Sequence, residues 1–352
     1  MPGAGPAARS RVVVIGLGGT ISMLARGEGG ATPALSAGEV VATVPGLAEA
    51  GIAVDTVEVA RLPGPSLGFA DLATVVTTAR ERLAAGASGV VVVQGTDTIE
   101  ETSYLLDLLH RRPEPIVVTG AMRHPGLPGA DGPANLLGAI RTAAEPGMRG
   151  QGVLVVLGDE IHAARRVRKT HTSSPASFRS PNGGPLGYLV EGTPVLLSRL
   201  PARTVVPLPD GVTWPRVGLV TATFGDDGRL WRGLADGCDG LVVAGFGGGH
   251  IPADAVSTLA DLAQRMPVVL ASRGGSGSVL ARTYGFAGSE SDLLARGVIR
   301  AGFLDPYKAR ILLTVLLAAT SPRGTIEAAF AAAGGYAAPT TWPWHHHDRP
   351  PA

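Results

Sequence analysis

The chain has 352 residues, and its 30 basic and 29 acidic side chains leave a formal net charge of +1. A balanced charge of this kind gives no general attraction to nucleic acid or to an anionic membrane surface, so we expect neither as a partner. The single cysteine, Cys238, cannot form a disulfide within the chain. No apolar stretch is long enough to cross a bilayer, and residues 1–6 lack the features of a secretion signal, so we expect a cytoplasmic protein.

The first half of the chain alternates between apolar strand patterns and amphipathic helix patterns. The segment 89–93 is apolar throughout, which is typical of parallel strands covered on both faces. Strands are predicted at 11–15, 89–93 and near residues 116 and 153, and helices at 72–83, 99–109 and 135–144. This alternation predicts a larger N-terminal α/β domain over residues 1–200.

A proline-rich stretch follows and predicts a linker over residues 201–215. Beyond it, strands are predicted at 217–221, 240–244 and 268–272, and helices at 253–265 and near Tyr307 and Ile326. We therefore expect a smaller C-terminal α/β domain over 216–340 and a disordered tail over 341–352. Histidines 345–347 are adjacent and cannot readily present three imidazoles to one ion, so we expect no metal there, and no metal site or cofactor elsewhere.

Two turns that carry threonine each follow directly on an apolar strand. Gly18-Gly19-Thr20-Ile21 follows the strand at 11–15, and Gln94-Gly95-Thr96-Asp97-Thr98 follows the strand at 89–93. Ligand sites in parallel sheets lie beyond the carboxyl ends of the strands, so both hydroxyls are candidates for chemistry. The ordinary alternative is helix capping, and Thr98 with Glu101 predicts a capping box at the next helix.

Other site patterns have weaker support. A dinucleotide fingerprint that begins at Gly16 needs glycine at position 21, where the chain has Ile21, and no phosphate-binding Gly-x-x-x-x-Gly-Lys-Ser/Thr stretch is present. The segment 64–68 matches the Gly-x-Ser-x-Gly pattern of serine hydrolases, with Asp159 and His250 as candidate partners. Flanking prolines disfavour the strand that must lead straight into such a serine.

Together with further segments, the two turns closely resemble the bacterial-type L-asparaginase family of amidohydrolases. The resemblance covers most of the chain, and the ordered series of segments is much more specific than either turn alone. The segments are 18–21, 94–98, 119–123, 130–136, 169–172, 184–188 and 304–310. The resemblance implies a two-domain asparaginase-like fold and hydrolysis of the L-asparagine side-chain amide to L-aspartate and ammonia, with no cofactor.

The resemblance also implies roles for four polar residues. Thr20 would be the nucleophile that forms an acyl-enzyme, and Thr96, Asp97 and Lys169 would form the supporting cluster. A threonine hydroxyl is a weak nucleophile and needs a neighbouring base or a polarising hydrogen bond. Burial would lower the pKa of Lys169 whereas a nearby Asp97 carboxylate would raise it, so the position of the proton stays open.

The small-molecule amide substrate would be bound by residues near the same turns. By resemblance, the Ser66 hydroxyl and nearby backbone, with Gly19 among the binding positions, would hold the α-carboxylate. Asp97 would accept from the α-ammonium group, and the Ala121 carbonyl would contact the departing amide nitrogen. Two further charged residues, Arg123 and Asp131, are expected to form a partly buried pair that organises the loop.

The chain departs from the family pattern in ways that leave its substrate open. Family members commonly carry a lid tyrosine just after the first threonine, but this chain has no tyrosine before Tyr104, so the expected lid at 22–33 lacks that phenol. His250 stands where some members have an asparagine that reaches a neighbouring subunit, and Glu290 is a candidate for the acidic residue supplied by that subunit. The family forms dimers, often paired into tetramers, and we expect a homodimer or homotetramer here.

Alternatives to L-asparagine hydrolysis therefore stay open. The chain could act on L-glutamine, on D-asparagine or on another small amide. It could also be a weakly active or non-catalytic homologue that binds an amino acid, although a binding pocket alone has no physical need for two threonine hydroxyls beside a lysine.

Overall fold

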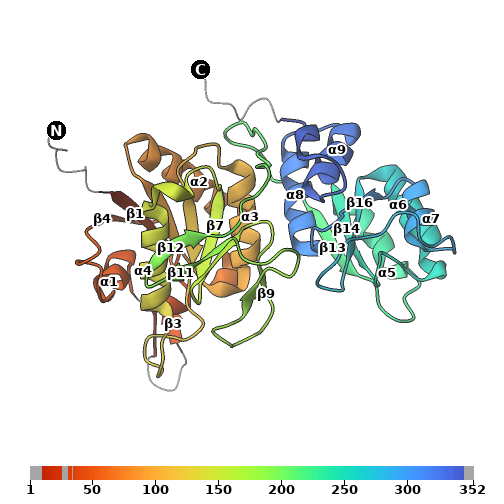
Figure 1. Ribbon diagram of the computed structural model, residues 1–352. Coiled ribbons are helices and arrows are strands. Elements are labelled where there is room, and N and C mark those ends of the chain that lie inside the picture. The colour runs from red at the N-terminus through yellow and green to blue at the C-terminus, as the bar shows by residue number, and fades with distance from the viewer. Residues whose placement is uncertain (1–9, 26–30, 34, 345–352) are drawn as a thin grey trace. The chain divides into compact units, whose positions relative to one another are not determined.

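The chain divides into two compact units, Met1–Leu200 and Pro201–Ala352 (Figure 1). The structure, a computed structural model, describes residues 10–25, 31–33 and 35–344. Each unit has its own sheet and its own apolar core. The predicted fold class, a larger N-terminal and a smaller C-terminal α/β domain, is confirmed.

The first unit is built on an eight-stranded mixed sheet with the strand order β12-β11-β8-β7-β6-β5-β1-β4. Five neighbouring strands run parallel: β1 (Arg11–Gly16), β4 (Ala53–Glu58), β5 (Gly89–Val93), β6 (Ile116–Thr119) and β7 (Val153–Leu157). Antiparallel pairing then adds β8 (Glu160–Ala163), β11 (Gly187–Val190) and β12 (Thr193–Leu196). Every residue of β5 is buried, as its apolar sequence predicts.

Helices cover both faces of this sheet. Helices α1 (Ala37–Ala42) and α4 (Gly132–Ala144) pack on the face that carries Val12, Val14 and Val91. Helices α2 (Phe69–Ala84) and α3 (Ile99–Leu109) pack against each other and on the opposite face (Figure 1). The predicted helices at 72–83, 99–109 and 135–144 are confirmed, because their apolar stripes form these buried faces.

The start of α3 differs from the prediction. Thr98 is the residue before the helix, but its side chain makes no capping hydrogen bond. A short 3-10 turn, Thr96–Thr98, leads into the helix instead, and the Thr98 hydroxyl donates to the Gly64 carbonyl at 3.2 Å. The capping box was a wrong prediction, because a partner distant in sequence takes the hydroxyl that would have capped the helix.

The second unit contains a four-stranded parallel sheet with the order β13-β14-β15-β16. Its strands are β13 (Val217–Thr221), β14 (Gly240–Gly245), β15 (Val268–Ser272) and β16 (Ile299–Arg300). Its helices are α5 (Arg229–Arg232), α6 (Val256–Arg265), α7 (Glu290–Ala295), α8 (Pro306–Ala318) and α9 (Arg323–Ala333). The apolar segment 311–317 lies within α8, where most of its side chains are buried.

The ends of the second unit are more ordered than the sequence predicts. Thr204, Val205 and Val206, in the expected linker, are buried. Trp342, in the expected disordered tail, is 2% exposed, and its indole donates to the Val205 carbonyl at 2.9 Å. An aromatic side chain that buries its ring and satisfies its N–H fixes the chain around it. Histidines 345–347 lie outside the described residues.

Candidate active site

Three turns meet, backbone against backbone, beyond the carboxyl ends of the first unit's parallel strands. Gly19 has a φ of +90°, and a Cβ added there would collide with the backbone of Gly95. A Cβ added at Gly95 would in turn lie 3.0 Å from the backbone nitrogen of Gly64, in the 3-10 turn Gly64–Ser66. Only glycine allows backbones to approach this closely, so the sequence brings the turns that carry both threonines and Ser66 together.

The second threonine lies in a cluster of three polar side chains. The Lys169 Nζ donates to Thr96 Oγ1 at 2.9 Å and to Asp97 Oδ1 at 2.6 Å. Thr96 is buried, whereas 61% of the Asp97 side chain is exposed. The Lys169 side chain therefore links a buried hydroxyl to a carboxylate that faces solvent.

The backbone of Lys169 is held by a small hairpin outside the main sheet. Strand β9 (Arg168–Lys169) pairs antiparallel with β10 (Phe178–Arg179). The Arg168 Nε lies 3.6 Å from Glu100 Oε2 at the start of α3. These contacts attach the lysine to the helix that follows the second threonine turn.

A chain of hydrogen bonds joins the second turn to the turn that carries Ser66. The Gln94 amide donates to the Thr98 hydroxyl at 3.0 Å, and that hydroxyl donates to the Gly64 carbonyl. Gln94 is fully buried, and its amide also donates to the Gly95 carbonyl at 3.1 Å. These bonds fix the 3-10 turn that presents Ser66, whose side chain is exposed.

This arrangement does not fit a serine-hydrolase elbow. Strand β4 ends at Glu58, and an irregular segment separates it from the turn that contains Ser66. The other suggested triad member, His250, lies in the second unit, where its Nε2 faces Glu290. Ser66 is therefore not delivered by a strand in the way that such a nucleophile requires.

The loop after β6 lies beside the second threonine. A Cβ added at Gly120 would lie 3.3 Å from Thr96 Cγ2. The Gly120 carbonyl accepts from Asn135 Nδ2 at 3.0 Å, and the next residue, Ala121, is fully buried. The backbone at Ala121 is thereby fixed close to the cluster, as its expected contact with the leaving amide requires.

Arg123 and Asp131 do not form the pair that we expected. The Asp131 carboxylate accepts from the backbone N–H groups of Met122 at 3.0 Å and Arg123 at 2.8 Å. The Arg123 guanidinium donates instead to the Gly129 carbonyl at 3.2 Å. Both side chains do organise the loop, but through backbone groups, because a tight loop leaves N–H and C=O groups that need partners.

The first threonine turn is joined to a short hairpin. Thr20 begins a 3-10 turn and is partly buried, and the Ser22 hydroxyl donates to the Gly19 carbonyl at 2.8 Å. Strands β2 (Met23–Ala25) and β3 (Ala31–Pro33) then pair antiparallel. The expected lid at 22–33 thus begins and ends in this hairpin, and residues 26–30 lie outside the described residues.

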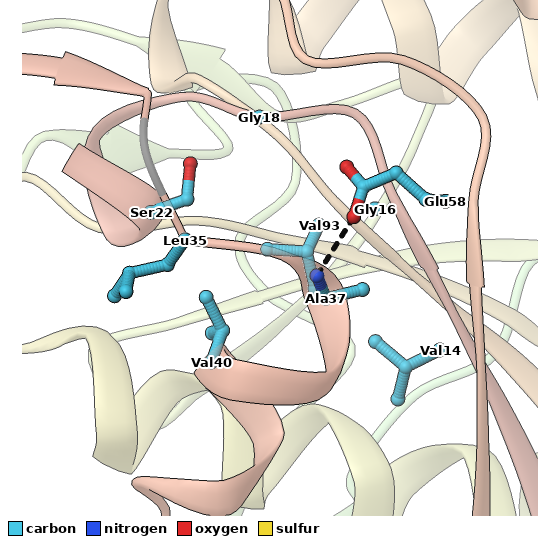
Figure 2. A pocket seen from close by; sticks show the side chains of 9 residues that line it. All are labelled: Val14, Gly16, Gly18, Ser22, Leu35, Ala37, Val40, Glu58 and Val93. Atoms are coloured by element: carbon cyan, nitrogen blue, oxygen red, sulfur yellow. Dashed lines mark hydrogen bonds between the residues drawn. The ribbon is translucent and has the colours of Figure 1, made fainter.

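A cavity of only about 10 Å³ lies behind the first turn (Figure 2). The Glu58 carboxylate points at the start of α1 and accepts from the Ala37 backbone N–H at 2.8 Å. The lining residues are Val14, Gly16, Gly18, Ser22, Leu35, Ala37, Val40, Glu58 and Val93. This volume suits about one water molecule and is too small for an amide substrate.

A larger cavity adjoins the polar cluster. It has a volume of about 380 Å³ and is lined by Asp97, Lys169, Thr170, His171 and Thr172. A cavity of this size accommodates a small amino-acid amide. The Asp97 and Lys169 side chains therefore border a space that is open to a small molecule.

The second unit brings together the two residues suspected of completing a neighbour's site. His250 Nε2 lies 3.1 Å from Glu290 Oε2, and the Glu290 side chain is fully buried. Burial raises the pKa of Glu290, but backbone N–H groups of Tyr284 and Thr283 and the contact with His250 outweigh it and hold that pKa below its usual value. The Glu290 carboxylate is thus a fixed anion that orients His250.

Among residues 10–25, 31–33 and 35–344, no group of three His, Cys, Asp or Glu side chains is arranged to hold a metal ion. The helices in this part of the chain are all too short or too polar to cross a membrane.

Comparison with known proteins gives the family. The model of the asparaginase N-terminal domain matches residues 11–202, and that of the glutaminase/asparaginase C-terminal domain matches residues 216–330. A probable L-asparaginase from Deinococcus radiodurans is 37% identical over 330 residues, which cover 92% of this chain and 98% of that protein. L-asparaginase 2 from Escherichia coli is 38% identical over 249 residues, or 69% of this chain and 70% of that protein.

A solved structure agrees with these matches. The probable cytoplasmic L-asparaginase from Campylobacter jejuni has a TM-score of 0.83 and 31% identity, and the match covers 92% of this chain and 99% of that one. The fold and the matches together define the class, a two-domain amidohydrolase. The chain belongs to the asparaginase family, which confirms the resemblance seen in its motifs.

Several side chains of the site make contacts that were not predicted. Gln94 and Thr98 belong to a predicted motif, but nothing local indicates that their side chains tie it to Gly64. Asn135 likewise follows a helix pattern, although its side chain also accepts from the Gly158 backbone N–H at 3.0 Å. A polar residue at a position that the helix periodicity marks as buried is the one signal that could have identified Asn135.

Proposed function

We propose that the protein hydrolyses the side-chain amide of L-asparagine to L-aspartate and ammonia, with Thr20 as nucleophile. The observation that carries the proposal is the shared Lys169 Nζ, bonded to both Thr96 and Asp97 beside the glycine contact between the two threonine turns. Membership of the asparaginase family and relatives named as L-asparaginases support the choice of substrate.

The proposed reaction has two halves. The Thr20 Oγ attacks the side-chain carbonyl carbon while its proton passes into the cluster of Thr96, Asp97 and Lys169. The carbon–nitrogen bond then breaks, the nitrogen takes up a proton and leaves as ammonia, and an ester of aspartate remains on Thr20. Water attacks this ester, the carbon–oxygen bond to Thr20 breaks, and the hydroxyl is restored as L-aspartate leaves.

Four positions around the cluster would bind the substrate. Ser66 and the Gly19 backbone would hold the α-carboxylate, because their turns adjoin through Gly95. The solvent-facing carboxylate of Asp97 would accept from the α-ammonium group. The backbone carbonyl of Ala121 would contact the departing nitrogen, and the fixed loop at this position supports that role.

We further propose that the enzyme works as a cytoplasmic homodimer or homotetramer. The buried anion of Glu290 and its partner His250 would complete the site of a neighbouring subunit. The similar protein from Campylobacter jejuni is described as a probable cytoplasmic L-asparaginase, which supports the location. Size-exclusion chromatography with light scattering would test the assembly, and a monomer with full activity would contradict it.

Ammonia release tests the proposed function directly. Purified protein is assayed with L-asparagine, D-asparagine, L-glutamine and small primary amides, beside the Thr20→Ala protein. We expect release from L-asparagine that disappears in the variant. Ammonia release by the Thr20→Ala protein would reject Thr20 as the nucleophile. No ammonia release from L-asparagine by the wild-type protein would reject L-asparagine as the substrate.

The same panel of amide substrates tests the main alternative, which is hydrolysis of L-glutamine. The matched C-terminal family covers glutaminases as well as asparaginases, which is the observation that favours this second candidate. A higher kcat/KM for L-glutamine than for L-asparagine would make it the function. We expect the opposite order.

A further inference from the structure

A buried histidine lies close to the hairpin that carries Lys169 and takes no part in the chemistry above. His162, on β8, has no solvent exposure. Its Nδ1 lies 2.9 Å from the Ser180 hydroxyl, and its Nε2 lies 3.2 Å from Glu160 Oε2. Nδ1 therefore has a hydrogen-bond partner, whereas the buried Nε2 lies near a carboxylate without forming a hydrogen bond to it.

We assign the tautomer of this ring from its surroundings. A lone pair on Nε2 would face the Glu160 carboxylate at 3.2 Å, so we place the proton on Nε2, which leaves Nδ1 to accept from the Ser180 O–H. Burial and the positive charge of Arg179 lower the pKa of His162 to about 4. The ring is therefore neutral at neutral pH, and Ser180 is held by an oriented acceptor.

These residues attach the Lys169 hairpin to the main sheet. Ser180 directly follows β10, in which Phe178 pairs with Lys169. Glu160, next but one to His162 on β8, also pairs with Arg179 at 3.3 Å. Strand β8 thus holds two successive residues at the end of β10.

The hairpin needs such an attachment because it forms a separate two-stranded sheet (Figure 1). At its loop end, the Thr170 N–H and hydroxyl both donate to the Ser177 carbonyl, at 2.7 Å and 2.9 Å. The Lys169 Nζ must meet two acceptors at once, and a long side chain does so reliably only from a fixed backbone. The position of β10 therefore sets the geometry of the cluster.

We propose that His162 and Ser180 are positioning residues for the hydrolysis: they fix β10, and through β10 they hold Lys169 against Thr96 and Asp97. The inference rests on the proposed function. Neither residue touches the substrate. Their loss is expected to lower kcat by a larger factor than it changes KM, because the displaced lysine belongs to the activating cluster.

Two matched substitutions of His162 test the roles of its two ring nitrogens separately. The amide of His162→Asn lies near the position of Nδ1 and can accept from Ser180, whereas the amide of His162→Gln lies near Nε2 and cannot. We expect His162→Asn to keep kcat within about threefold of wild type, and His162→Gln and Ser180→Ala to lose roughly 10- to 100-fold. The pH profile of kcat should also shift in the latter two, because Lys169 changes its partners.

A purely structural role gives a different result. It would lower the melting temperature of His162→Asn and His162→Gln alike and leave kcat and its pH profile unchanged in the folded enzymes. Wild-type kcat in folded Ser180→Ala or His162→Gln protein would overturn the proposal.

A crystal structure of Ser180→Ala provides a readout that does not depend on the reaction. We expect the Lys169 Nζ to leave hydrogen-bond distance of Thr96 Oγ1, and an unchanged cluster would overturn the positioning role. If wild-type protein releases no ammonia from L-asparagine, the proposed function is rejected. The positioning role is still tested, because the crystal structure of Ser180→Ala shows whether Lys169 has moved.

Discussion

The two threonine turns follow neighbouring strands, β1 and β5, yet the structure holds their hydroxyls in opposite ways. Thr96 is buried and accepts a hydrogen bond from Lys169, within a turn that Gln94 and Thr98 tie to its surroundings. Thr20 is partly buried, and no residue within the described part of the chain donates to or accepts from its hydroxyl. Its turn is fixed through glycine backbone contacts instead.

This difference suits two different tasks. A supporting hydroxyl must be oriented before the substrate arrives, because it acts by holding a proton or a water molecule in place. A nucleophile needs an accessible oxygen that is not committed to other partners in the resting enzyme. The comparison therefore supports the proposal that Thr20 attacks the substrate and Thr96 assists its activation.

Removing either threonine hydroxyl should have the largest effect on activity. We expect Thr20→Ala to lower kcat by roughly 10⁴-fold or more, since it removes the nucleophile. Thr96→Ala should lower kcat by about 10²- to 10⁴-fold, because it removes the oriented partner of Lys169. Steady-state ammonia release measures both.

Thr20→Ser and Thr96→Ser are the matched controls, because each keeps a hydroxyl. Both should retain a measurable part of the activity, and circular dichroism should show an unchanged fold in all four variants. Full activity in either alanine variant would end the two-threonine account.

The backbone contact between the turns can be broken separately with Gly19→Ala. The added methyl group meets the Gly95 backbone and also requires a positive φ, so we expect a loss of roughly 3–4 kcal/mol in the free energy of unfolding. Urea denaturation measures this loss. Gly51→Ala is the control, because Gly51 has a φ of +68° but no atom within 4 Å of an added Cβ, and about 1–2 kcal/mol is expected there. Equal losses would show that Gly19 is not a close contact.

Local patterns predicted the fold better than the site. The strand at Gly89–Val93 is apolar at every position, which only a buried strand explains. Strand β4 was missed because it is mostly exposed or half-buried, and β9 because it has two residues and depends on β10 for its pairing. A short or exposed strand leaves little signal in its own sequence.

The cluster of Thr96, Asp97 and Lys169 was predicted by resemblance alone, and the contacts that tie its turns together were not predicted. Nothing in the sequence around Lys169 indicates that its side chain reaches Thr96, which lies 73 residues earlier in the chain. The Thr98 hydroxyl was assigned to a helix cap because its partner, the Gly64 carbonyl, is equally remote in sequence. Side-chain partners that tertiary folding supplies override local preferences of this kind.

Acid should weaken the attachment of the Lys169 hairpin through His162, which faces Glu160 and Arg179. The pKa of His162 is about 4 in the folded chain and 6.5 when unperturbed, so the unfolded chain binds more protons between these values. The free energy of unfolding should therefore fall as the pH falls from 6.5 towards 4, by roughly 3 kcal/mol at about 1.4 kcal/mol per pKa unit. Urea denaturation across this range, with His162→Asn beside wild type, measures it. An identical pH dependence in both proteins would contradict the assignment.

The smallest expected effect concerns substrate binding at the third turn. Ser66→Ala should raise KM for L-asparagine about tenfold and leave kcat nearly unchanged, because it removes one hydrogen bond of about 1–1.5 kcal/mol to the substrate. Thr74→Ala, on the exposed surface of α2, is the control and should change neither constant. A lower kcat with an unchanged KM would move Ser66 from binding to catalysis.

The identity of the acylated residue tests the account most directly. Wild-type enzyme is mixed with L-asparagine, quenched in acid within the first turnover, digested and mapped by mass spectrometry. The account predicts an aspartyl ester on the peptide that contains Thr20 and no ester on the peptide that contains Thr96. An ester on Thr96, or on any residue in the Thr20→Ala protein, would contradict it.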